Sequence, residues 1–340
     1  LSTSIKKMTA DNKPKIGFIE GHGETAPNAM IQVVQSLSVL YDLEPVSLDE
    51  SSVNLQKYKT LVIVDPKDSI PESHLLKLDE FLASGKNIYV AMNRVNGNLQ
   101  ASTGTVVNTG LERWLEKKGI RVNPNFIVDQ NCGNVMVNQQ QGYMTFQSSL
   151  RFPYLPLITK FADNPAMKGL NSVMLQFASS IDFFAMNKEV NFTALASTSD
   201  HSGTENPPLT FNINRNWQQK DFPLSNLTVC GLLSGKIAGS LPSRLMIVSD
   251  GDFPVNGEGQ TARQLPPDNV NFIVNAIDWL SDDTGLIDLR TKQVTSRPID
   301  PMDDAKKALL KYLNFLLPII LIIGYGLFRW QYRRNLRVKR

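Results

Sequence analysis

The sequence predicts an α/β fold with three parts: a parallel sheet covered by helices, a less regular mixed or β-rich region, and a C-terminal transmembrane helix. Strand-like apolar runs alternate with segments of helical periodicity through residues 1–125, and the alternation returns after residue 240. This order is typical of a parallel sheet with helices on both faces. A long uncharged apolar stretch near the C-terminus predicts the membrane helix. A chain of 340 residues is long enough to bury a large core.

The first elements follow from short apolar runs and from the spacing of apolar residues between them. Four runs predict strands, at 15–20 (KIGFIE), 43–48, 60–64 (TLVIV) and 87–92 (NIYVAM). The run at 60–64 is apolar throughout, as in strands that are buried on both faces. Residues 27–40 and 71–84 carry apolar side chains at helical spacing, and Gly85 ends the second of these helices.

The middle of the chain has a less regular pattern. Residues 93–110 are rich in Asn, Ser, Thr and Gly and are predicted to form a loop, before a short helix at 111–118 and a strand at 120–129. Residues 130–150 contain no charged residue, which fits exposed hairpins or a long crossing loop. Further β-like runs lie at 173–177, 192–196 and 227–238. We therefore interpret residues 126–240 as the mixed or β-rich region.

The α/β pattern resumes with a strand predicted at 244–249 (RLMIVS), a helix at 269–280 and a final strand at 286–290. A segment with Pro298 and Pro301 then leads to the membrane helix. The predicted organisation is an α/β domain of residues 1–125 and 241–290, the mixed region 126–240, a juxtamembrane linker 291–308, a transmembrane helix 309–328 and a basic tail 329–340.

The transmembrane helix is predicted from residues 312–328, which contain no charge. Lys311 and Arg329 can extend from its ends toward the lipid headgroups, and aromatic residues flank it as in membrane-interface belts. Pro318 is tolerated in a membrane span, although it would break a soluble helix. A buried core helix is the less favoured alternative, because the RWQYRRNLRVKR sequence that follows has no apolar face to bury.

The basic tail predicts the orientation of the chain. The last twelve residues hold six basic residues and no acidic one, whereas the whole chain carries a net charge of only +3. The positive-inside rule then places the C-terminus in the cytoplasm and the body outside it. A slightly acidic body argues against nucleic acid as a partner. Residues 1–15 contain no apolar segment of a signal peptide, so we expect this chain to be a fragment whose missing N-terminus carries a signal peptide or a first membrane helix.

Several motifs of enzymes are absent from the sequence. It contains no P-loop, so any ATP-driven process would need another subunit to hydrolyse the nucleotide. It also contains no GxSxG or HExxH motif. The three histidines, His22, His74 and His201, are scattered along the chain, which does not favour a His-rich metal site. We expect no catalytic residue, metal or cofactor.

Polar residues follow four of the predicted parallel strands, where the carboxyl ends of such strands form a ligand crevice. The candidate ligand-binding residues are His22, Glu24, Asp65, Asn93, Asp250 and Asp252. The alternative is that Asp and Asn after strands cap turns and helices, and the sequence favours this alternative. Asp250 and Asp252 also have the chemistry to bind a hard cation, although two carboxylates alone are a weak signal.

The two cysteines, Cys132 and Cys230, leave two alternatives open. Outside the cytoplasm they can form a disulfide. Cys230 lies within a predicted strand, so a buried thiol is at least as well supported.

Five phrases occur together in the order in which they stand in a known family. They are KIGFIEGHGE at 15–24, NTGLERWLEKKGIRVNPNFIVDQNCG at 108–133, FPYLPLITKFADNPAMKGLNSVMLQFASSIDF at 152–183, RLMIVSDGDF at 244–253 and NFIVNAIDWLSDDTGLIDLR at 271–290. In these phrases the chain resembles the GldG family of Bacteroidota, whose members are gliding-motility-associated, substrate-binding-like subunits of ABC transporters. The resemblance implies a glutamine-amidotransferase-like or flavodoxin-like α/β domain. It also implies a region outside the cytoplasm, anchored to a permease and served by a separate cytoplasmic ATPase.

One feature of active amidotransferases is absent. Their nucleophilic cysteine follows a central strand, whereas the NIYVAM strand here continues into Asn93 and Arg94. The resemblance therefore supplies no catalytic residue.

We expect a non-enzymatic auxiliary subunit of an ABC transporter in the bacterial inner membrane, with its body in the periplasm. Its partners are then the lipid bilayer, a permease and an ATPase. Pro318, Gly324 and Gly326 are the candidate membrane-packing residues, because small residues let helices approach closely. The alternatives are a periplasmic solute-capture protein that uses the strand-end crevice, and a periplasmic hydrolase or metal-dependent enzyme that uses Asp250 and Asp252.

Overall fold

The computed structural model describes residues 13–49, 53–141, 144–184, 188–282 and 304–338. The chain divides into two compact units, Leu1–Arg297 and Pro298–Arg340, and each is described here by itself. The predicted strand at 286–290 and most of the linker 291–308 lie outside the described residues.

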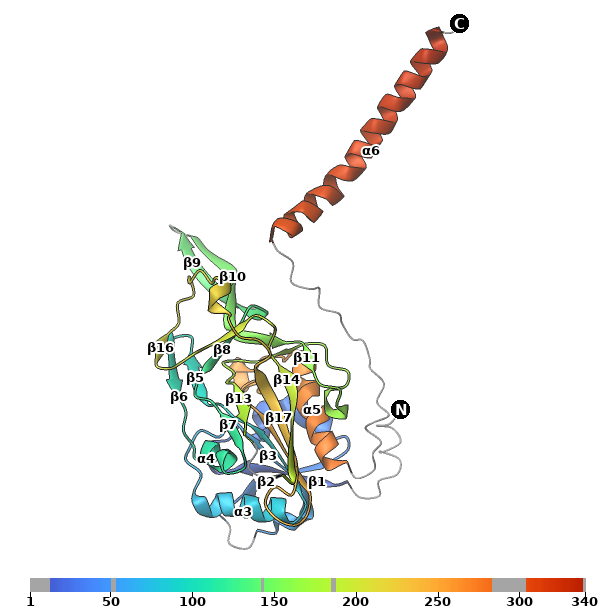
Figure 1. Ribbon diagram of the computed structural model, residues 1–340. Helices are drawn as coiled ribbons and strands as arrows, with labels where there is room; N and C mark the ends of the chain where they lie inside the picture. Colours follow the sequence, from blue (N-terminus) through green and yellow to red (C-terminus); the bar gives the residue numbers. More distant parts are fainter. Residues whose placement is uncertain (1–12, 50–52, 142–143, 185–187, 283–303, 339–340) are drawn as a thin grey trace. The chain divides into compact units, whose positions relative to one another are not determined.

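An eight-stranded sheet forms the centre of the first unit (Figure 1). Its strands, in spatial order, are β11 (Lys160–Phe161), β14 (Val190–Ser197), β17 (Thr228–Gly235), β18 (Ser243–Val248), β4 (Asn87–Ala91), β3 (Tyr58–Val64), β1 (Lys15–Glu20) and β2 (Asp42–Ser47). The five strands from β18 to β2 are parallel, as the sequence predicts.

The prediction of an entirely parallel sheet is wrong at the other edge. β17 is antiparallel to β18, and β14 and β11 continue the sheet in antiparallel steps. These three strands come from the 126–240 region, which therefore extends the same sheet. The physical reason is that only residues 236–242 connect β17 to β18, and so short a connection joins antiparallel strands, whereas parallel strands require a crossover of about a dozen or more residues.

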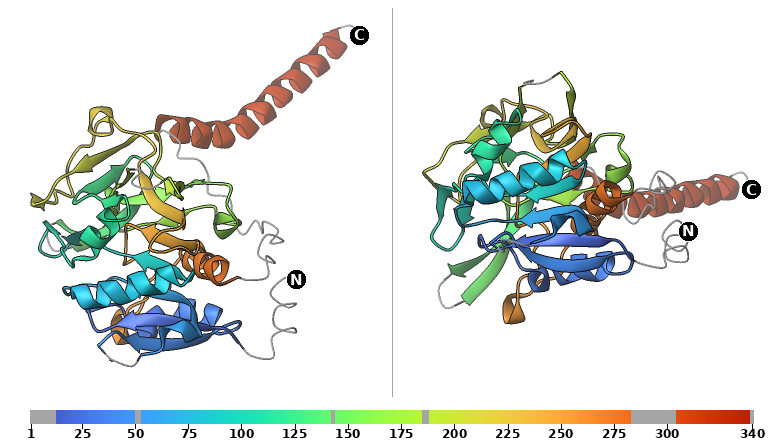
Figure 2. Two further views of the ribbon diagram at one scale, coloured as in Figure 1. Left: turned by 60° about the horizontal axis from the view of Figure 1, so that its bottom comes forward. Right: turned by 90° about the horizontal axis from the view of Figure 1, so that it is seen from below.

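Helices cover both faces of the sheet (Figure 2). On one face α2 (Ile31–Leu37) and α5 (Pro267–Ser281) pack against β1, β3 and β4 in a core that includes Val33, Ile273 and Val62. On the other face α3 (Glu72–Ala83) and α4 (Leu111–Glu116) contribute Leu78 and Leu115 to a second core. The strands that the sequence identified as fully apolar are thus buried on both sides.

Smaller sheets form the rest of the unit. Their strands are β5 (Val95–Asn98), β6 (Thr103–Val106), β7 (Ile120–Val122), β8 (Phe126–Asp129), β9 (Cys132–Gln141), β10 (Met144–Ile158), β12 (Val173–Met174), β13 (Ile181–Phe183), β15 (Ser202–Glu205) and β16 (Leu209–Thr210). Of these, β5, β8 and β10 contribute to an aromatic cluster that includes Phe126, Phe152, Tyr154 and Phe211. The short 3₁₀ helices are η1 (Pro27–Met30), η2 (Leu55–Lys57), η3 (Pro165–Met167), η4 (Gln219–Asp221) and η5 (Gly259–Thr261).

The middle of the chain differs from the prediction at residues 93–110 and 120–129 and agrees with one of the two structures expected at 130–150. Residues 93–110, predicted as a loop, contain the β5–β6 pair, because polar Thr and Asn side chains are accommodated on its exposed positions. The strand predicted at 120–129 is two strands, interrupted around Pro124. Residues 130–150 form the β9–β10 hairpin, which was one of the two structures expected there.

The second unit contains one long helix, α6 (Asp304–Val338), which is drawn in red in Figure 1. Its segment Ala308–Tyr332 is long and apolar enough to cross a membrane. Pro318 lies inside this helix, and the positions of a Cβ atom on Gly324 and Gly326 face open space. The helix is thus continuous through the predicted span, and close helix packing at Pro318, Gly324 and Gly326 stays a prediction.

Both cysteines are free. Cys230 is fully buried in β17, and burial raises the pKa of its thiol. Burial also raises the pKa of the partly exposed Cys132. The structure therefore favours thiols over the disulfide alternative.

Candidate ligand site at the strand ends

Four neighbouring parallel strands, β18, β4, β3 and β1, end at one edge of the sheet, and the six predicted ligand-binding residues follow them. The structure brings these residues together as the sequence predicts. It also buries His22, Asp65, Asn93 and Asp250 almost completely. The geometry divides them into two adjacent groups, one centred on Asn93 and one on His22.

Asn93 joins two carboxylates. Its Nδ2 donates to Asp65 Oδ1 and to Asp252 Oδ2, each at 2.9 Å, and its Oδ1 accepts the N–H of Gly251 at 2.9 Å. Both amide hydrogens and the carbonyl are therefore used within the protein. Gly251 is required here, because a Cβ on it would lie 2.8 Å from Asp65 Cα.

Asp65 sits at a strained backbone position, with φ of 53°. Its Oδ2 accepts from Lys67 Nζ at 3.1 Å and from the Thr25 hydroxyl at 3.4 Å. Burial and the nearby Asp252 carboxylate raise the pKa of Asp65. Non-glycine residues with positive φ cluster at functional sites, so this position fits either a ligand role or a tight structural junction.

Asp250 is the most enclosed carboxylate of the group, with no exposed surface. It accepts three backbone N–H groups, from Gln176 at 2.5 Å, Asp252 at 2.7 Å and Phe253 at 3.2 Å. Burial raises the pKa of Asp250, and the Asp252 charge adds to the effect. Because its oxygens already bind N–H donors, Asp250 could ligate a cation only by giving up some of these bonds. Asp250 therefore caps the turn that follows β18 and also ties this turn to the backbone at Gln176.

The second group is a chain of four side chains in contact. The sequence predicts His22 and Glu24 as site residues, but not their contact with His74 and Asp49. Glu24 accepts from the backbone N–H of His22 at 2.6 Å and lies 2.9 Å from His22 Nδ1. His22 Nε2 lies 2.8 Å from Nδ1 of His74 on α3, and His74 Nε2 lies 3.4 Å from Asp49. The Glu24 side chain is only 1% exposed, whereas that of Asp49 is 76% exposed.

His74 was missed because its partner is 52 residues away. The available signal was its position four residues before Leu78, which places it on the buried face of α3. Asp49 was missed for the same reason, since it reaches His74 only once the sheet is assembled. Lys67 lies only two residues after Asp65, so its pairing with this carboxylate was open to prediction.

The histidine pair predicts how stability depends on pH. Burial, followed by the adjacent His22, lowers the pKa of His74 below its ordinary value of 6.5. Asp49 and Glu24 oppose this shift, and Lys77 adds to it. The folded protein then binds the proton less readily than the unfolded chain does. This stabilising contribution is complete above about pH 6.5 and is lost as the pH falls through the pKa of folded His74.

Between pH 7.5 and 5.5 the wild-type chain should therefore lose more thermal stability than a His74→Gln variant, by about 2 °C or more in Tm. His201→Gln is the matched control, because His201 is exposed. This control should keep the wild-type pH dependence. Equal pH dependence in all three proteins would contradict the assignment.

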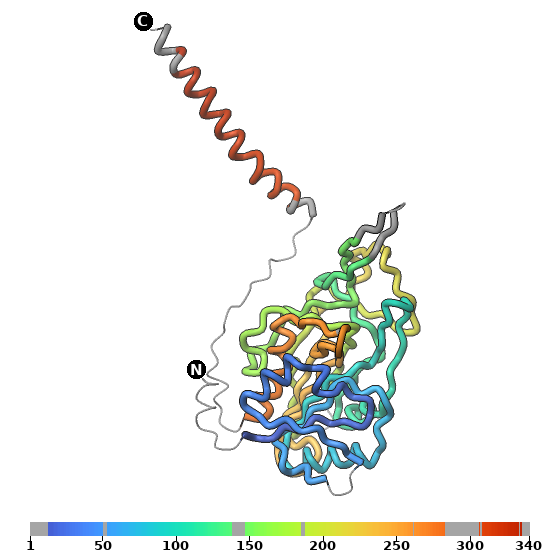
Figure 3. The backbone as a smooth tube through the Cα atoms, turned by 180° about the vertical axis from the view of Figure 1, so that it is seen from behind, coloured from blue at the N-terminus to red at the C-terminus, as the bar shows by residue number. Residues whose placement is uncertain are grey.

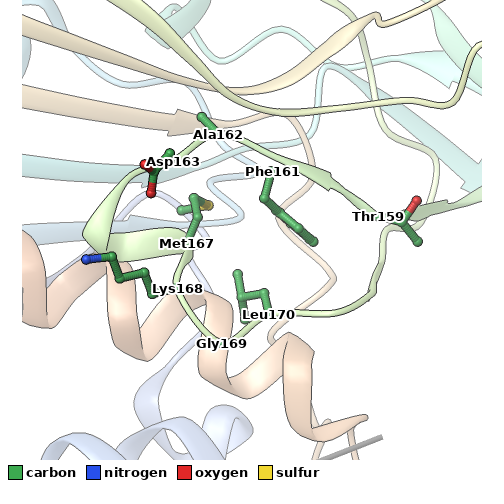
Figure 4. Close-up of a pocket in the computed structure, with 8 residues that line it drawn as sticks. All are labelled: Thr159, Phe161, Ala162, Asp163, Met167, Lys168, Gly169 and Leu170. Carbon is green, nitrogen blue, oxygen red and sulfur yellow. The ribbon is translucent and has the colours of Figure 1, made fainter. Parts of the chain in front are cut away.

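Pockets lie elsewhere on the body, and two of them are similar in volume. One, of about 490 Å³, is formed around η3 and β11, where Phe161, Met167 and Leu170 provide apolar walls and Asp163 and Lys168 lie at the rim (Figure 4). The other, of about 510 Å³, is lined by Arg151, Trp217 and several carboxamides. None of the six strand-end residues lines either pocket. Within the described ranges, no group of three or more His, Cys, Asp or Glu side chains is arranged to hold a metal ion.

Comparison with solved structures shows the fold. The body is similar to the structure described as mmIFT52 N-terminal domain, with a TM-score of 0.53 and 15% identity over 79% of this chain and 98% of that chain. A ThuA-like protein from Parabacteroides merdae matches with a TM-score of 0.42 and 13% identity, over 85% of this chain and 94% of that chain. At 15% identity the first similarity shows a shared fold and carries no information about activity.

Comparison with families is more informative. A search of curated proteins finds no match. Residues 13–276 match the family model described as ABC-type uncharacterized transport system, a range that includes the whole eight-stranded sheet and most of α5. Because this match spans more than half of the 340 residues, the chain belongs to that family of auxiliary proteins of ABC-type transport systems.

Proposed function

We propose that this protein is a non-enzymatic, membrane-anchored auxiliary subunit of an ABC transporter, with its body in the periplasm and α6 in the inner membrane. The observation that carries the proposal is the family match over residues 13–276. In this proposal α6 packs against permease helices, and a separate cytoplasmic ATPase hydrolyses the nucleotide. The resemblance to the GldG family extends the proposal to a transporter associated with gliding motility.

The side-chain geometry supports a subunit that performs no chemistry of its own. Asn93 uses both amide hydrogens and its carbonyl oxygen within the protein, and both oxygens of Asp250 accept backbone N–H groups. A hydrolase needs a nucleophile or base that is free to reach its substrate. A solute-capture protein likewise needs polar groups that are free to bind, so capture at the strand ends would require this network to open.

Purification from native membranes tests the proposal. The full chain carrying an affinity tag should bring a polytopic permease and a P-loop ATPase with it in mild detergent. The matched control is the same chain with α6 replaced by an unrelated apolar helix, which should insert but recover less of both partners. Recovery of the full chain alone, under conditions in which other membrane complexes survive, would overturn the proposal.

Cysteine labelling tests the orientation. In a Cys132→Ser background, a cysteine at Asn335 should resist a membrane-impermeant thiol reagent in intact cells. A cysteine at Ser240, an exposed position of the body, should react once the outer membrane is permeabilised. The expected contrast follows from six basic residues in the last twelve. The reverse labelling pattern would place the body in the cytoplasm.

A further inference from the structure

The β9–β10 hairpin contains a long two-stranded ribbon, which we define as residues 134–141 paired with residues 144–151. Eight consecutive antiparallel pairs join the two strands. Beyond the ribbon, β10 pairs with β12 at Leu157 and Ile158. In the described parts of the chain, the outer edge of β9 pairs with no other strand. Figure 1 shows β9 and β10 extending away from the rest of the body, and Figure 3 shows the base of this pair from behind.

The base of the ribbon is firmly held. Phe152, Tyr154 and Leu155 follow it directly in β10 and belong to the aromatic cluster, and Val135 packs against that cluster from β9. Phe152 and Tyr154 each contact Phe211, with ring centroids 5.8 Å and 4.8 Å apart. The ribbon is thus presented on a rigid base, which lowers the entropic cost of pairing its edge with another strand.

The composition of the ribbon lacks the usual protection of an exposed edge. Native edge strands are commonly blunted by Lys, by Pro or by other charged residues. Residues 130–150 contain no charged residue and no proline, although the chain has 35 basic and 32 acidic residues among 340. Met136, near the middle of β9, is 60% exposed. An uncharged and unpaired edge that exposes Met136 is suited to binding another strand.

β9 is better suited to this than β10. All ten residues of β9 are uncharged, and the described structure leaves its outer edge unpaired throughout. In β10 the uncharged stretch ends at Arg151, where the register shifts. At about 3.4 Å per residue, the eight paired residues of β9 give an edge of about 27 Å.

The absence of charge also indicates the occupant. In a two-fold antiparallel pairing of identical strands, a residue near the axis faces its own counterpart, so any charge there would meet a like charge. A different partner would allow opposite charges across the edge and would not require neutrality.

We propose that the outer edge of β9 pairs with the same edge of a second copy of this chain. The result is a continuous sheet of four strands in the order β10–β9–β9–β10, with Met136 close to the two-fold axis. This proposal concerns self-association and does not depend on the proposed transporter function.

Charge substitution at Met136 tests the proposal. The full chain in mild detergent should be a dimer by light scattering and native mass spectrometry. Met136→Lys and Met136→Glu should each weaken dimerisation by at least tenfold, because like charges then meet at the axis. A mixture of the two variants should form mixed dimers again. Met136→Gln is the neutral control and should remain dimeric.

Cross-linking supplies a second readout. In a Cys132→Ser background, Met136→Cys should form a disulfide-linked dimer on mild oxidation, and Ser240→Cys should not. Circular dichroism should show the same fold in all variants, since Met136 is exposed in the single chain. The Lys and Glu variants should lose only the concentration-dependent part of Tm that dimerisation adds. A wild-type chain that stays monomeric at every soluble concentration would overturn the proposal. So would dimers that persist equally in the Lys and Glu variants, or a Met136→Lys variant that loses only a different protein partner.

Discussion

Replacing Asp250 by asparagine should lower the free energy of unfolding by about 1–3 kcal/mol, the usual cost of leaving a buried polar group without its partner. The Asp250 carboxylate accepts three backbone N–H groups. Asparagine can keep the bonds to Asp252 and Phe253 through its single oxygen. It then places an NH₂ group against the N–H of Gln176, which loses its acceptor. Asp250→Ala should cost more, because all three N–H groups lose their acceptor.

Chemical unfolding of the full chain in mild detergent measures this effect. Asp163→Asn is the matched control, because Asp163 is exposed at the rim of the pocket in Figure 4 and its change should be nearly neutral. Folded Asp250→Asn protein should still support function in the cell. A variant that keeps wild-type stability and abundance but is inactive would instead favour a ligand-binding or catalytic role for Asp250.

Replacing Gly324 and Gly326 together by leucine should sharply reduce co-purification of the permease and ATPase while leaving insertion intact. Leucine partitions well into lipid, so the helix should still span the membrane. A neighbouring helix that approaches closely at glycine would meet a new side chain. Residues two apart lie about 200° apart around a helix, so the two glycines occupy different faces. If one neighbour packs here, one of the two single variants should account for most of the loss.

The matched control is Ile319→Leu, which exchanges one large apolar side chain for another. The readout is the amount of permease and ATPase recovered per mole of tagged chain. Full recovery with the double leucine variant would show that α6 is a passive anchor, as would full function of the body released from the membrane.

Much of the sheet could be predicted from the sequence, because burial on both faces leaves a recognisable apolar run. The runs at 15–20 and 60–64 correspond to β1 and β3 almost residue for residue. The direction of β17 could not be predicted in the same way. An apolar run has the same composition in parallel and antiparallel neighbours, and its direction depends on which strand it meets.

In the candidate site, too, one part could be predicted from the sequence and another part depends on how the elements pack. That residues after neighbouring parallel strands share one edge follows from topology alone, and the structure places Asp65 and Asp252 each within hydrogen-bonding distance of Asn93. The contact of His22 with His74 depends on how α3 docks on the sheet, which periodicity does not specify. The bond from Gln176 to Asp250 depends on the mixed region, whose position the sequence pattern left open.

A photo-cross-link from α6 tests the central proposal most directly. Tyr325 lies between the two glycines and is 65% exposed, so an aromatic photoreactive residue can replace it at little cost. Irradiation of native membranes, followed by mass spectrometry, should yield an adduct between this chain and a polytopic ABC permease. Adducts only with lipid, or only with a second copy of this chain, from a correctly inserted helix would contradict the assignment as a transporter subunit.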